Sequence, residues 1–514
     1  MKTADIYFWR ITLIFVIAKL CFHFFTNTNY ELHRDEMLYF NMGEHFSMGY
    51  VSVPPMIGWL ASIVKLVFGN SVFGIRFFPA LFGAVSILII ARTIKDLGGS
   101  YLALITALSA FLFSTGFLLF DTLFTPNVIE QFLWLVIAYL VFRLVISQNT
   151  KIWIWIGITA GFSLLTKYSI VFLITGFLIA VILSRHRKIL LSRHFVYAVC
   201  IALIIFSPNL IWQSSHNWPV IHHMEQLNKT QIANMRYSFY LADIFSLNSF
   251  SSFIWMFGIV VLIFVKRERE YQHIGIAALI TILLFMISGG KGYYMLGLVP
   301  FLFAFGAYSM EKYFQGKFNW INYAIITLSV AASLLALPYG LPVLSFQNLS
   351  KYSEATGNMI MYPFSRWEDG ISYKTSQVYS DMTGWNEMVS IVAKAYGQLP
   401  KEKQKTCTIF AEKNYGYAGA VHFYGEKYQL PDAITFLDNY VLWAPDTIPG
   451  GAFIYINKDT GRTANLFDSV TEIGQVNDPY FRERGLKVFV CASPKTDIRK
   501  IYSQMAMEEK NMYE

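Results

Sequence analysis

Long apolar runs recur through the first 340 residues, and they constrain the fold more than any other feature of the chain. Each run approaches the length at which an α-helix crosses a bilayer, about 20 residues. The runs lie at 6–25, 72–91, 101–120, 127–145, 152–166, 169–184, 195–213, 251–265, 272–288, 293–310 and 319–340. Only 14% of all residues are charged, against about 25% in soluble globular proteins. We therefore expect a polytopic α-helical membrane protein with about eleven transmembrane helices.

The charges of the connecting loops predict the topology. Basic residues gather in alternate loops, at 92–95, 143–151, 184–193, 266–270 and 312–317. Loops rich in Lys and Arg stay in the cytoplasm, so the N-terminus is expected there and the first loop outside it. An odd number of helices then places the C-terminal part outside the cytoplasm. The expected location is the inner (plasma) membrane.

The composition changes after residue 340, where charged residues and turn residues become more frequent. The segments 406–412, 451–457 and 486–493 resemble buried strands, and 385–399 has helical periodicity. We expect a transmembrane domain over 1–340 and an extracytoplasmic α/β domain over 341–514. Cys407 and Cys491 both fall in the second domain and could pair in an oxidising compartment.

The first outer loop contains "YELHRDEMLYF" at 30–40, which groups Asp35 and Glu36 among aromatic residues. A helix over 31–48 would place Glu31, Asp35 and Tyr39 on one face. Charge runs are usually solvated faces, and an interfacial helix with routine charges is one interpretation. The aromatic setting indicates a loop lying against the bilayer, however, where an unpaired carboxylate is costly. We therefore predict a catalytic role for Asp35 and Glu36.

Three cationic residues are predicted on the same side of the membrane. They are Lys167 in "LLTKYSIVFL", Lys291 in "SGGKGYYMLG" and Arg76 in "FGIRFFPA". Each could extend to lipid headgroups. As a set they suit an anionic phosphate presented from within the membrane. A carboxylate with phosphate-binding cations on one side of a membrane indicates group transfer from a lipid phosphate.

Further polar residues extend the list of candidates. Asp121, a further candidate catalytic residue, and Glu130, a candidate for substrate contact, flank Thr125-Pro126, which have the pattern of a helix start. His216, His222 and His223 lie in the loop at 214–249 and, like Tyr39, could contact the acceptor or another substrate. Their spacing matches no recognised metal motif, so a divalent metal stays an open question and no cofactor is assigned. No phosphate-binding loop, dinucleotide or nucleic-acid motif is present.

An ordered set of motifs carries a family resemblance. The segments "ELHRDEMLYF", "GYVSVPPMIGWL", "FGNSVFGIRFFPAL", "LLTKYS", "PNLIWQSSHNWP" and "NYGYAGAVHFYG" together resemble bacterial glycosyltransferase family 39. This family belongs to the membrane GT-C superfamily, which includes protein O-mannosyltransferases and lipid A aminoarabinose transferases. The resemblance extends over almost the whole chain.

The resemblance implies a sugar donor linked to polyprenyl phosphate, an extracytoplasmic acceptor and contact with membrane lipids. Asp35 matches the catalytic acidic residue of the family, whose usual proposed role is general base toward the acceptor or positioning of the acceptor. Lys167 and the "KGYY" stretch, with Lys291 and Tyr293, match positions near the lipid phosphate. A single displacement would invert the anomeric carbon.

The chain also departs from the family pattern. Ser52 and Val53 stand where many members have Asp, His or Lys, Asn127 stands where many have Asp, and Tyr417 stands where relatives often have Glu. A lipid A aminosugar transferase is therefore an alternative rather than the leading prediction. A flippase of lipid-linked sugars is an alternative of another class. It should line a path through the bilayer with polar groups, whereas the charged candidates here gather at one face.

Overall fold

The structure is a computed structural model, which describes residues 3–230, 237–365, 367, 369–461 and 463–513. The chain divides into two compact units. The helical unit contains Met1–Thr28, Arg76–Leu210 and Glu225–Phe364, and the sheet unit contains Asn29–Ile75, Ile211–Met224 and Ser365–Glu514. The expected boundary at residue 340 therefore differs from the observed division. The segment predicted as the first outer loop packs with the sheet, and the segment that follows the last apolar run packs with the helices.

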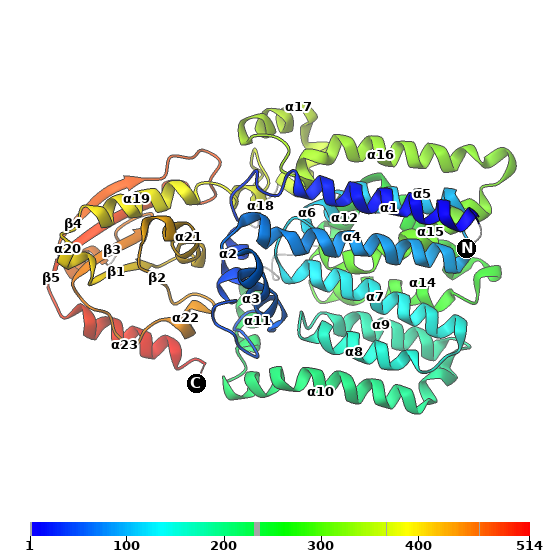
Figure 1. The fold of residues 1–514 in the computed structure, drawn as a ribbon, viewed down its shortest axis with the longest axis horizontal. Coiled ribbons are helices and arrows are strands. Elements are labelled where there is room, and N and C mark those ends of the chain that lie inside the picture. Colours follow the sequence, from blue (N-terminus) through cyan, green and yellow to red (C-terminus); the bar gives the residue numbers. More distant parts are fainter. Residues whose placement is uncertain (1–2, 231–236, 366, 368, 462, 514) are drawn as a thin grey trace. The chain divides into compact units, whose positions relative to one another are not determined.

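All eleven predicted apolar runs contain an α-helix. The helices are α1 (Thr3–Phe24), α4 (Val72–Leu97), α5 (Tyr101–Phe113), α7 (Pro126–Ser147), α8 (Ile152–Leu164), α9 (Ile170–Leu183), α10 (Arg193–Ser215), α13 (Ser252–Phe264), α14 (Gln272–Ile287), α15 (Val299–Tyr313) and α16 (Trp320–Gly340). Shorter elements join them, namely α6 (Thr115–Phe120), α11 (Pro219–Thr230), α12 (Tyr237–Asn248), η5 (Gly292–Gly297) and α17 (Phe346–Ser365). Figure 1 shows the long helices of this unit lying side by side.

By length and composition, the described residues form six apolar segments long enough to cross a membrane, in α1, α4, α7, α10, α12–α13 and α16. The runs over α5, α8, α9 and α14 form shorter apolar helices of 10–17 residues. The buried core of the helical unit is made of aliphatic and aromatic side chains from successive helices, including Phe111, Trp134 and Phe301. The chain is thus a polytopic helical membrane protein with an additional small sheet, as predicted.

The sheet unit is built around a mixed five-stranded sheet of order β2-β1-β3-β5-β4. Its strands are β1 (Cys407–Ala411), β2 (Ala433–Ile434), β3 (Ala452–Asn457), β4 (Phe467–Gln475) and β5 (Lys487–Pro494). Strand β1 pairs in parallel with β2 and β3, whereas β5 pairs antiparallel with β3 and β4. The three predicted strands coincide with β1, β3 and β5.

Helices cover both faces of this sheet. The C-terminal part contains α18 (Gln377–Ser380), α19 (Trp385–Gly397), α20 (Lys401–Gln404), α21 (Tyr415–Gly425), α22 (Tyr440–Trp443) and α23 (Ile498–Lys510), of which α19, α21 and α23 pack on the sheet. Ile498, Tyr502 and Ala506, spaced one helical turn apart on α23, pack against Phe410 and Phe453 of the sheet. Figure 1 shows α19 and α21 on the opposite side from α23. Residues of β1 and β3 are buried throughout, as expected for strands covered on both faces.

The two cysteines of the sheet do not form a disulfide. Cys407 and Cys491 are both free and buried. Cys407 lies opposite Ala452, and Cys491 lies opposite Phe453 on the other side of β3. Since β3 separates their strands, the structure gives no support to the pairing that their common domain had allowed.

The first outer loop forms two helices of the sheet unit, α2 (Arg34–Asn41) and α3 (Met56–Phe68). The prediction of one helix over 31–48 was therefore too long. His33 adopts an extended backbone and caps α2, which leaves Glu31 outside the helix. The Glu31 carboxylate instead accepts a hydrogen bond from the backbone N–H of Trp385 at 2.7 Å. It thus caps the N-terminus of α19, where the helix dipole favours a negative charge.

Candidate functional site

The N-terminus of α2 positions the predicted acidic residues. The His33 imidazole Nδ1 accepts a hydrogen bond from the backbone N–H of Asp35 at 3.1 Å. In return the Glu36 carboxylate accepts one from the backbone N–H of His33 at 2.9 Å. This reciprocal capping box satisfies two N–H groups that a helix start would otherwise leave unpaired. The structure thus places the carboxylate of Glu36, which is fully buried, on its own helix terminus and leaves Asp35 as the more accessible acid.

Asp35 contacts side chains from distant parts of the sequence. The Tyr415 hydroxyl donates a hydrogen bond of 2.6 Å to Asp35 Oδ1. Arg34 Nε lies 3.4 Å from the same oxygen, and His33 Nδ1 lies 3.8 Å from Oδ2. The Asp35 side chain keeps 30% of its surface exposed. Tyr39 follows one helical turn later and is half-buried.

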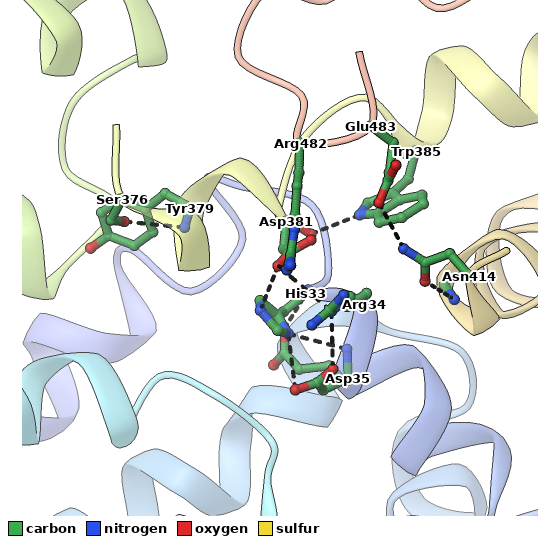
Figure 2. Close-up of polar contacts among 12 residues, drawn as sticks. His33, Arg34, Asp35, Ser376, Tyr379, Asp381, Trp385, Asn414, Arg482 and Glu483 are labelled. Carbon is green, nitrogen blue, oxygen red and sulfur yellow. Dashed lines mark hydrogen bonds and ion pairs between the residues drawn. The ribbon is translucent and has the colours of Figure 1, made fainter. Parts of the chain in front are cut away.

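A second carboxylate, Asp381, holds the surrounding cations in place (Figure 2). It follows α18 and is 1% exposed. Its Oδ2 atom lies 2.7 Å from Arg482 Nη1, 3.5 Å from His33 Nε2 and 3.6 Å from Arg34 Nε. The Asp381 backbone carbonyl accepts a hydrogen bond from the Trp385 indole at 2.7 Å. Asp381 therefore links the start of α2 to α19 and to the turn before β5.

The charges of this cluster keep Asp35 ionised. Burial raises the pKa of Asp35, but the imidazole of His33 when protonated, the Arg34 guanidinium, the Tyr415 hydrogen bond and Arg482 together lower that pKa below its ordinary value. The Tyr415 hydroxyl is buried against this carboxylate, which raises its pKa well above the usual range. Tyr415 therefore remains a hydrogen-bond donor at all physiological pH values, and Asp35 remains a charged acceptor.

The predicted phosphate-binding Lys167 belongs to a separate cluster inside the helical unit. Its Nζ atom lies 3.1 Å from Glu130 Oε2 and donates a hydrogen bond of 2.9 Å to Asn127 Oδ1. The ammonium also lies over the ring of Tyr294, 4.3 Å from its centroid, and 6.0 Å from that of Tyr293. Glu130 accepts a further hydrogen bond from the Ser169 hydroxyl. The structure thus brings together the predicted residues Lys167, Glu130 and Tyr293.

The remaining predicted residues of the helical unit have other partners. Asp121 is buried and forms an ion pair of 2.7 Å with Lys19 Nζ of α1. Arg76 is also fully buried and donates a hydrogen bond to the backbone carbonyl of Asn27. Lys291 precedes η5, is half-buried and acts electrostatically on Asp243. Asp121 and Arg76 are thus each engaged inside the helical unit.

The three predicted histidines do not converge. His216 stacks on Trp212 with ring centroids 4.2 Å apart, and His222 is exposed. His223 is near enough to the Asp438 carboxyl for their charges to interact. Burial lowers the pKa of His223, and the neighbouring carboxylate offsets part of that effect. Within the described ranges, no three His, Cys, Asp or Glu side chains are grouped to hold a metal ion.

Two residues that depart from the family pattern, Ser52 and Tyr417, each form a hydrogen bond with a carboxylate from another part of the chain. The Ser52 hydroxyl donates a hydrogen bond of 2.9 Å to Asp438 Oδ1. Tyr417, which stands where relatives often have Glu, is buried, and its hydroxyl hydrogen-bonds with Glu483. Glu483 is also bonded by Asn414 at 3.0 Å (Figure 2). A carboxylate is therefore present beside position 417, although it comes from another part of the chain.

Sequence reasoning missed Asp381, Arg482 and Tyr415. Asp381 and Arg482 lie in irregular segments of the C-terminal part, and Tyr415 begins α21 within "NYGYAGA". The motif "NYGYAGA" contains both Tyr415 and Tyr417, and only position 417 departs from the family pattern. The one feature of the sequence that could have indicated Tyr415 is the family resemblance, because "NYGYAGA" is among the segments that carry it.

Comparisons with known proteins agree with the predicted resemblance. Residues 52–212 match the family described as dolichyl-phosphate-mannose-protein mannosyltransferase. A stretch of 194 residues is 26% identical to the lipid A galacturonosyltransferase RgtD of Rhizobium johnstonii, and it covers 38% of this chain and 41% of that protein. The chain thus matches less than half the length of this relative.

Solved structures match over nearly the whole chain. The structure of ArnT from Cupriavidus metallidurans bound to undecaprenyl phosphate aligns with a TM-score of 0.63, at 12% identity, over 95% of this chain and 97% of that one. The structure of ArnT in the apo state aligns with a TM-score of 0.61 at 11% identity. At such low identity the likeness establishes a common fold. Together with the family match and the similarity to RgtD, this common fold confirms the predicted resemblance: the chain is similar to membrane glycosyltransferases such as ArnT and the protein mannosyltransferases.

Proposed function

We propose that this chain is a membrane glycosyltransferase that transfers a sugar from a polyprenyl-phosphate-linked donor to an extracytoplasmic acceptor. The observation that carries the proposal is the Asp35 carboxylate, kept charged at the start of α2 by Arg34, Arg482 and the 2.6 Å hydrogen bond from Tyr415. The relationship to glycosyltransferases supports this interpretation. The common fold with an ArnT structure bound to undecaprenyl phosphate supports the choice of donor.

Asp35 is proposed to receive the proton of the acceptor hydroxyl. A lowered pKa makes a carboxylate a weak base, and general bases work best when their pKa lies near the working pH. Glycosyl transfer relaxes this requirement, because the transition state resembles an oxocarbenium ion. The attacking hydroxyl becomes acidic as it bonds to that carbon, so a weak base can accept its proton late. The negative charge also stabilises the positive sugar ring.

Lys167 and Lys291 are proposed to bind the donor phosphate, with Tyr293 beside them. Glu130 and Asn127 fix the Lys167 ammonium at 3.1 and 2.9 Å, so its position does not depend on the ligand. A departing phosphate gains from a positive charge that is already in place. Arg76 fits this role less well, because its guanidinium is fully buried and bonded to a backbone carbonyl. A single displacement would invert the anomeric centre.

A deletion strain provides the test. Mass spectrometry of its glycolipids and glycoproteins should reveal a missing sugar, which wild-type chain restores. Asp35→Asn should fail to restore it, since loss of general-base help costs about 10²–10⁴-fold in rate. Asp468→Asn is the matched control, because Asp468 is an exposed carboxylate of β4 in the same unit. If Asp35→Asn restores the product at the wild-type rate, the assignment of Asp35 is wrong.

We further propose that the N-terminus is cytoplasmic and that the C-terminal part lies outside the cytoplasm. The alternation of basic loops supports this orientation. A reporter that is active only after translocation should therefore be active when it is fused after Tyr339. Activity of a reporter that works only in the cytoplasm would contradict the orientation.

Lipid A is a second candidate for the acceptor, because the matched relative is a lipid A galacturonosyltransferase. Mass spectrometry of lipid A from the deletion strain distinguishes this candidate by the loss of one sugar residue. The flippase alternative predicts another result. A flippase moves lipid-linked sugars without forming a glycosidic bond, so the purified chain would yield no new glycoside from donor and acceptor.

A further inference from the structure

Each of the two lysines proposed to bind the donor phosphate lies beside a carboxylate of the helical unit. Lys167 Nζ lies 3.1 Å from Glu130 Oε2 of α7. The charge of Lys291 interacts with that of Asp243 in α12. A neutral partner can also hold an ammonium here, because Asn127 Oδ1 accepts a hydrogen bond of 2.9 Å from Lys167. Since a nearby negative charge weakens the binding of an anion, the two carboxylates lower the affinity for phosphate, and their presence calls for a functional reason.

Glu130 is placed to act on a ligand through its charge alone. Its side chain is 5% exposed, whereas that of Lys167 is 20% exposed. The Glu130 carboxylate also accepts a hydrogen bond from the Ser169 hydroxyl, which fixes its position. An incoming phosphate can therefore reach the Lys167 ammonium but not the Glu130 carboxylate behind it.

Asp243 is fixed at the start of η5. Its carboxylate accepts a hydrogen bond from the backbone N–H of Gly292, the residue that follows Lys291. A Cβ atom at Gly292 would lie 2.4 Å from the Cβ atom of Asp243, so α12 and η5 pack together with no room for a side chain between them. This close contact keeps the Asp243 carboxylate beside the η5 segment that Lys291 precedes.

Both lysine–carboxylate pairs meet at η5. The Lys167 ammonium lies 4.3 Å from the ring centroid of Tyr294 and 6.0 Å from that of Tyr293. Both tyrosines belong to η5, and Lys291 immediately precedes this helix. The two pairs therefore act on the same region, and their four charged groups together carry no net charge.

Transfer of the sugar changes the charge of the phosphate. The donor is a phosphodiester with one negative charge. When the bond between the anomeric carbon and the phosphate oxygen breaks, that oxygen keeps the electron pair, and the acceptor proton passes to Asp35. The product is a phosphate monoester, which carries about 1.5 to 2 negative charges at pH 7. Two lysines without anionic partners would hold this product more tightly than the donor, and slow product release limits the turnover of many enzymes.

We propose that Glu130 and Asp243 are internal counter-ions, which oppose the doubly charged product more strongly than the singly charged donor and so promote product release. They determine which charge state the site retains, and they take no part in the bond changes of transfer. This inference rests on the proposed function, because it takes Lys167 and Lys291 as the phosphate site.

Binding of two lipids to the full chain in nanodiscs at pH 8 tests the proposal. Undecaprenyl phosphate is the monoester probe, and undecaprenyl methyl phosphate is the diester probe with one negative charge. Asp243→Asn and Glu130→Gln each remove one negative charge and keep an oxygen that accepts hydrogen bonds. Glu268→Gln is the matched control, because Glu268 bonds Lys312 at 2.6 Å in the same unit, on the predicted cytoplasmic side. Neither probe requires a sugar or an acceptor.

The effect on the two probes should differ in a defined ratio. Coulomb energy is proportional to the charge of the ligand, so the logarithm of the gain in affinity should be about twice as large for the monoester. For each of the two variants we expect about 2- to 10-fold tighter binding of the diester and about 4- to 100-fold tighter binding of the monoester. Glu268→Gln should leave both affinities at the wild-type values. In transfer assays, Asp243→Asn should lower both kcat and the KM for the donor, because the product leaves more slowly.

Each other outcome contradicts a particular step. Weaker or unchanged binding of the monoester by the folded variants would overturn the proposal, because the carboxylates would then only position the lysines. Equal gains for the two probes would also overturn it, since the site would not distinguish product from donor. If the wild-type chain binds neither lipid, the phosphate site of the proposed function is wrong as well. Thermal unfolding identifies a variant that does not fold, and the other variant then decides.

Discussion

Replacing Tyr415 by Phe removes one hydroxyl and tests the electrostatics of Asp35. The hydroxyl donates a 2.6 Å hydrogen bond to Asp35 Oδ1. The bond joins residues 380 positions apart in the sequence. Phe retains the ring, and the remaining contacts of Asp35 with Arg34 and His33 do not involve Tyr415. The substitution therefore changes the stability of the charged carboxylate with little change in packing.

The magnitude follows from the kind of bond. Hydrogen bonds to charged groups contribute about 1.5–3 kcal/mol, so the loss shifts the balance between neutral and ionised Asp35 by at most roughly 10- to 150-fold. The wild-type pKa is lowered, so Asp35 stays ionised until the pH falls below the ordinary carboxyl range. In Tyr415→Phe the pKa rises, and protonation begins at higher pH. Transfer should therefore fail earlier on the acidic side and change little above neutral pH.

The assay is the pH dependence of transfer by the purified chain, with the donor and acceptor identified from the deletion strain. Tyr373→Phe is the matched control, because its hydroxyl donates a 2.7 Å hydrogen bond to Asp369 in the same unit. Only Tyr415→Phe should move the acidic limb of the profile. If the rate instead falls equally at all pH values, Tyr415 orients Asp35 or the substrate, and the electrostatic argument is refuted.

Three further predictions concern Glu36, His422 and Lys167. Glu36→Gln should keep nearly full transfer activity, since Gln can complete a capping box, and Glu36→Ala should lower stability by about 0.5–2 kcal/mol; inactive but stable Glu36→Gln would assign Glu36 a chemical role. The pKa of His422 is raised to about 9, so its stabilisation is complete below pH 6.5 and is lost as the pH rises through 9. Because its carboxylate partners are partly exposed, this stabilisation of the folded state amounts to about 1 kcal/mol. In thermal unfolding, His422→Gln should lose less stability than wild type between pH 7 and 9. A pH profile parallel to that of wild type would contradict this prediction. Lys167→Gln should weaken binding of undecaprenyl phosphate by about 10-fold or more, whereas Lys312→Gln, whose lysine also pairs with a buried Glu, should not; equal affinities would mean that Lys167 only anchors helices.

Local patterns in the sequence were sufficient to predict most of the helices and strands. Every apolar run became a helix because its signal lies within about 20 neighbouring residues. The strands β1, β3 and β5 were found because they are short, apolar and buried. Strand β4 was missed, since its residues are largely exposed and give no apolar run. The predicted helix was too long at both ends, by residues 31–33 because His33 caps α2, and by residues 42–48 because α2 ends at Asn41.

The candidate site was predictable only where its chemistry is local. Asp35 could be named as a candidate, because a carboxylate in a segment so rich in aromatic residues is unusual in itself. Asp381 and Arg482 could not, because their contacts join segments 101 residues apart. The partner of Asp121 could not be predicted for the same reason. Its ion pair with Lys19 joins two apolar segments far apart in the sequence, and neither segment contains a pattern that indicates the other. The attachment of residues 29–75 to the sheet unit is likewise a property of long-range packing.

Asp35 and Asp381 have different partners, which explains how Asp35 can be charged and still have an oxygen that a substrate could reach. Two arginines beside a single carboxylate would occupy both of its oxygens and leave no acceptor for a substrate hydroxyl. Asp381 prevents this by binding Arg482 at 2.7 Å, while Arg34 Nε lies between the two carboxylates, 3.4 Å from Asp35 Oδ1 and 3.6 Å from Asp381 Oδ2. Asp35 then feels the positive field of both guanidiniums but accepts its one short hydrogen bond, among the described side chains, from Tyr415. Its Oδ2 atom, 3.8 Å from His33 Nδ1, is the oxygen that we propose accepts the proton of the acceptor hydroxyl.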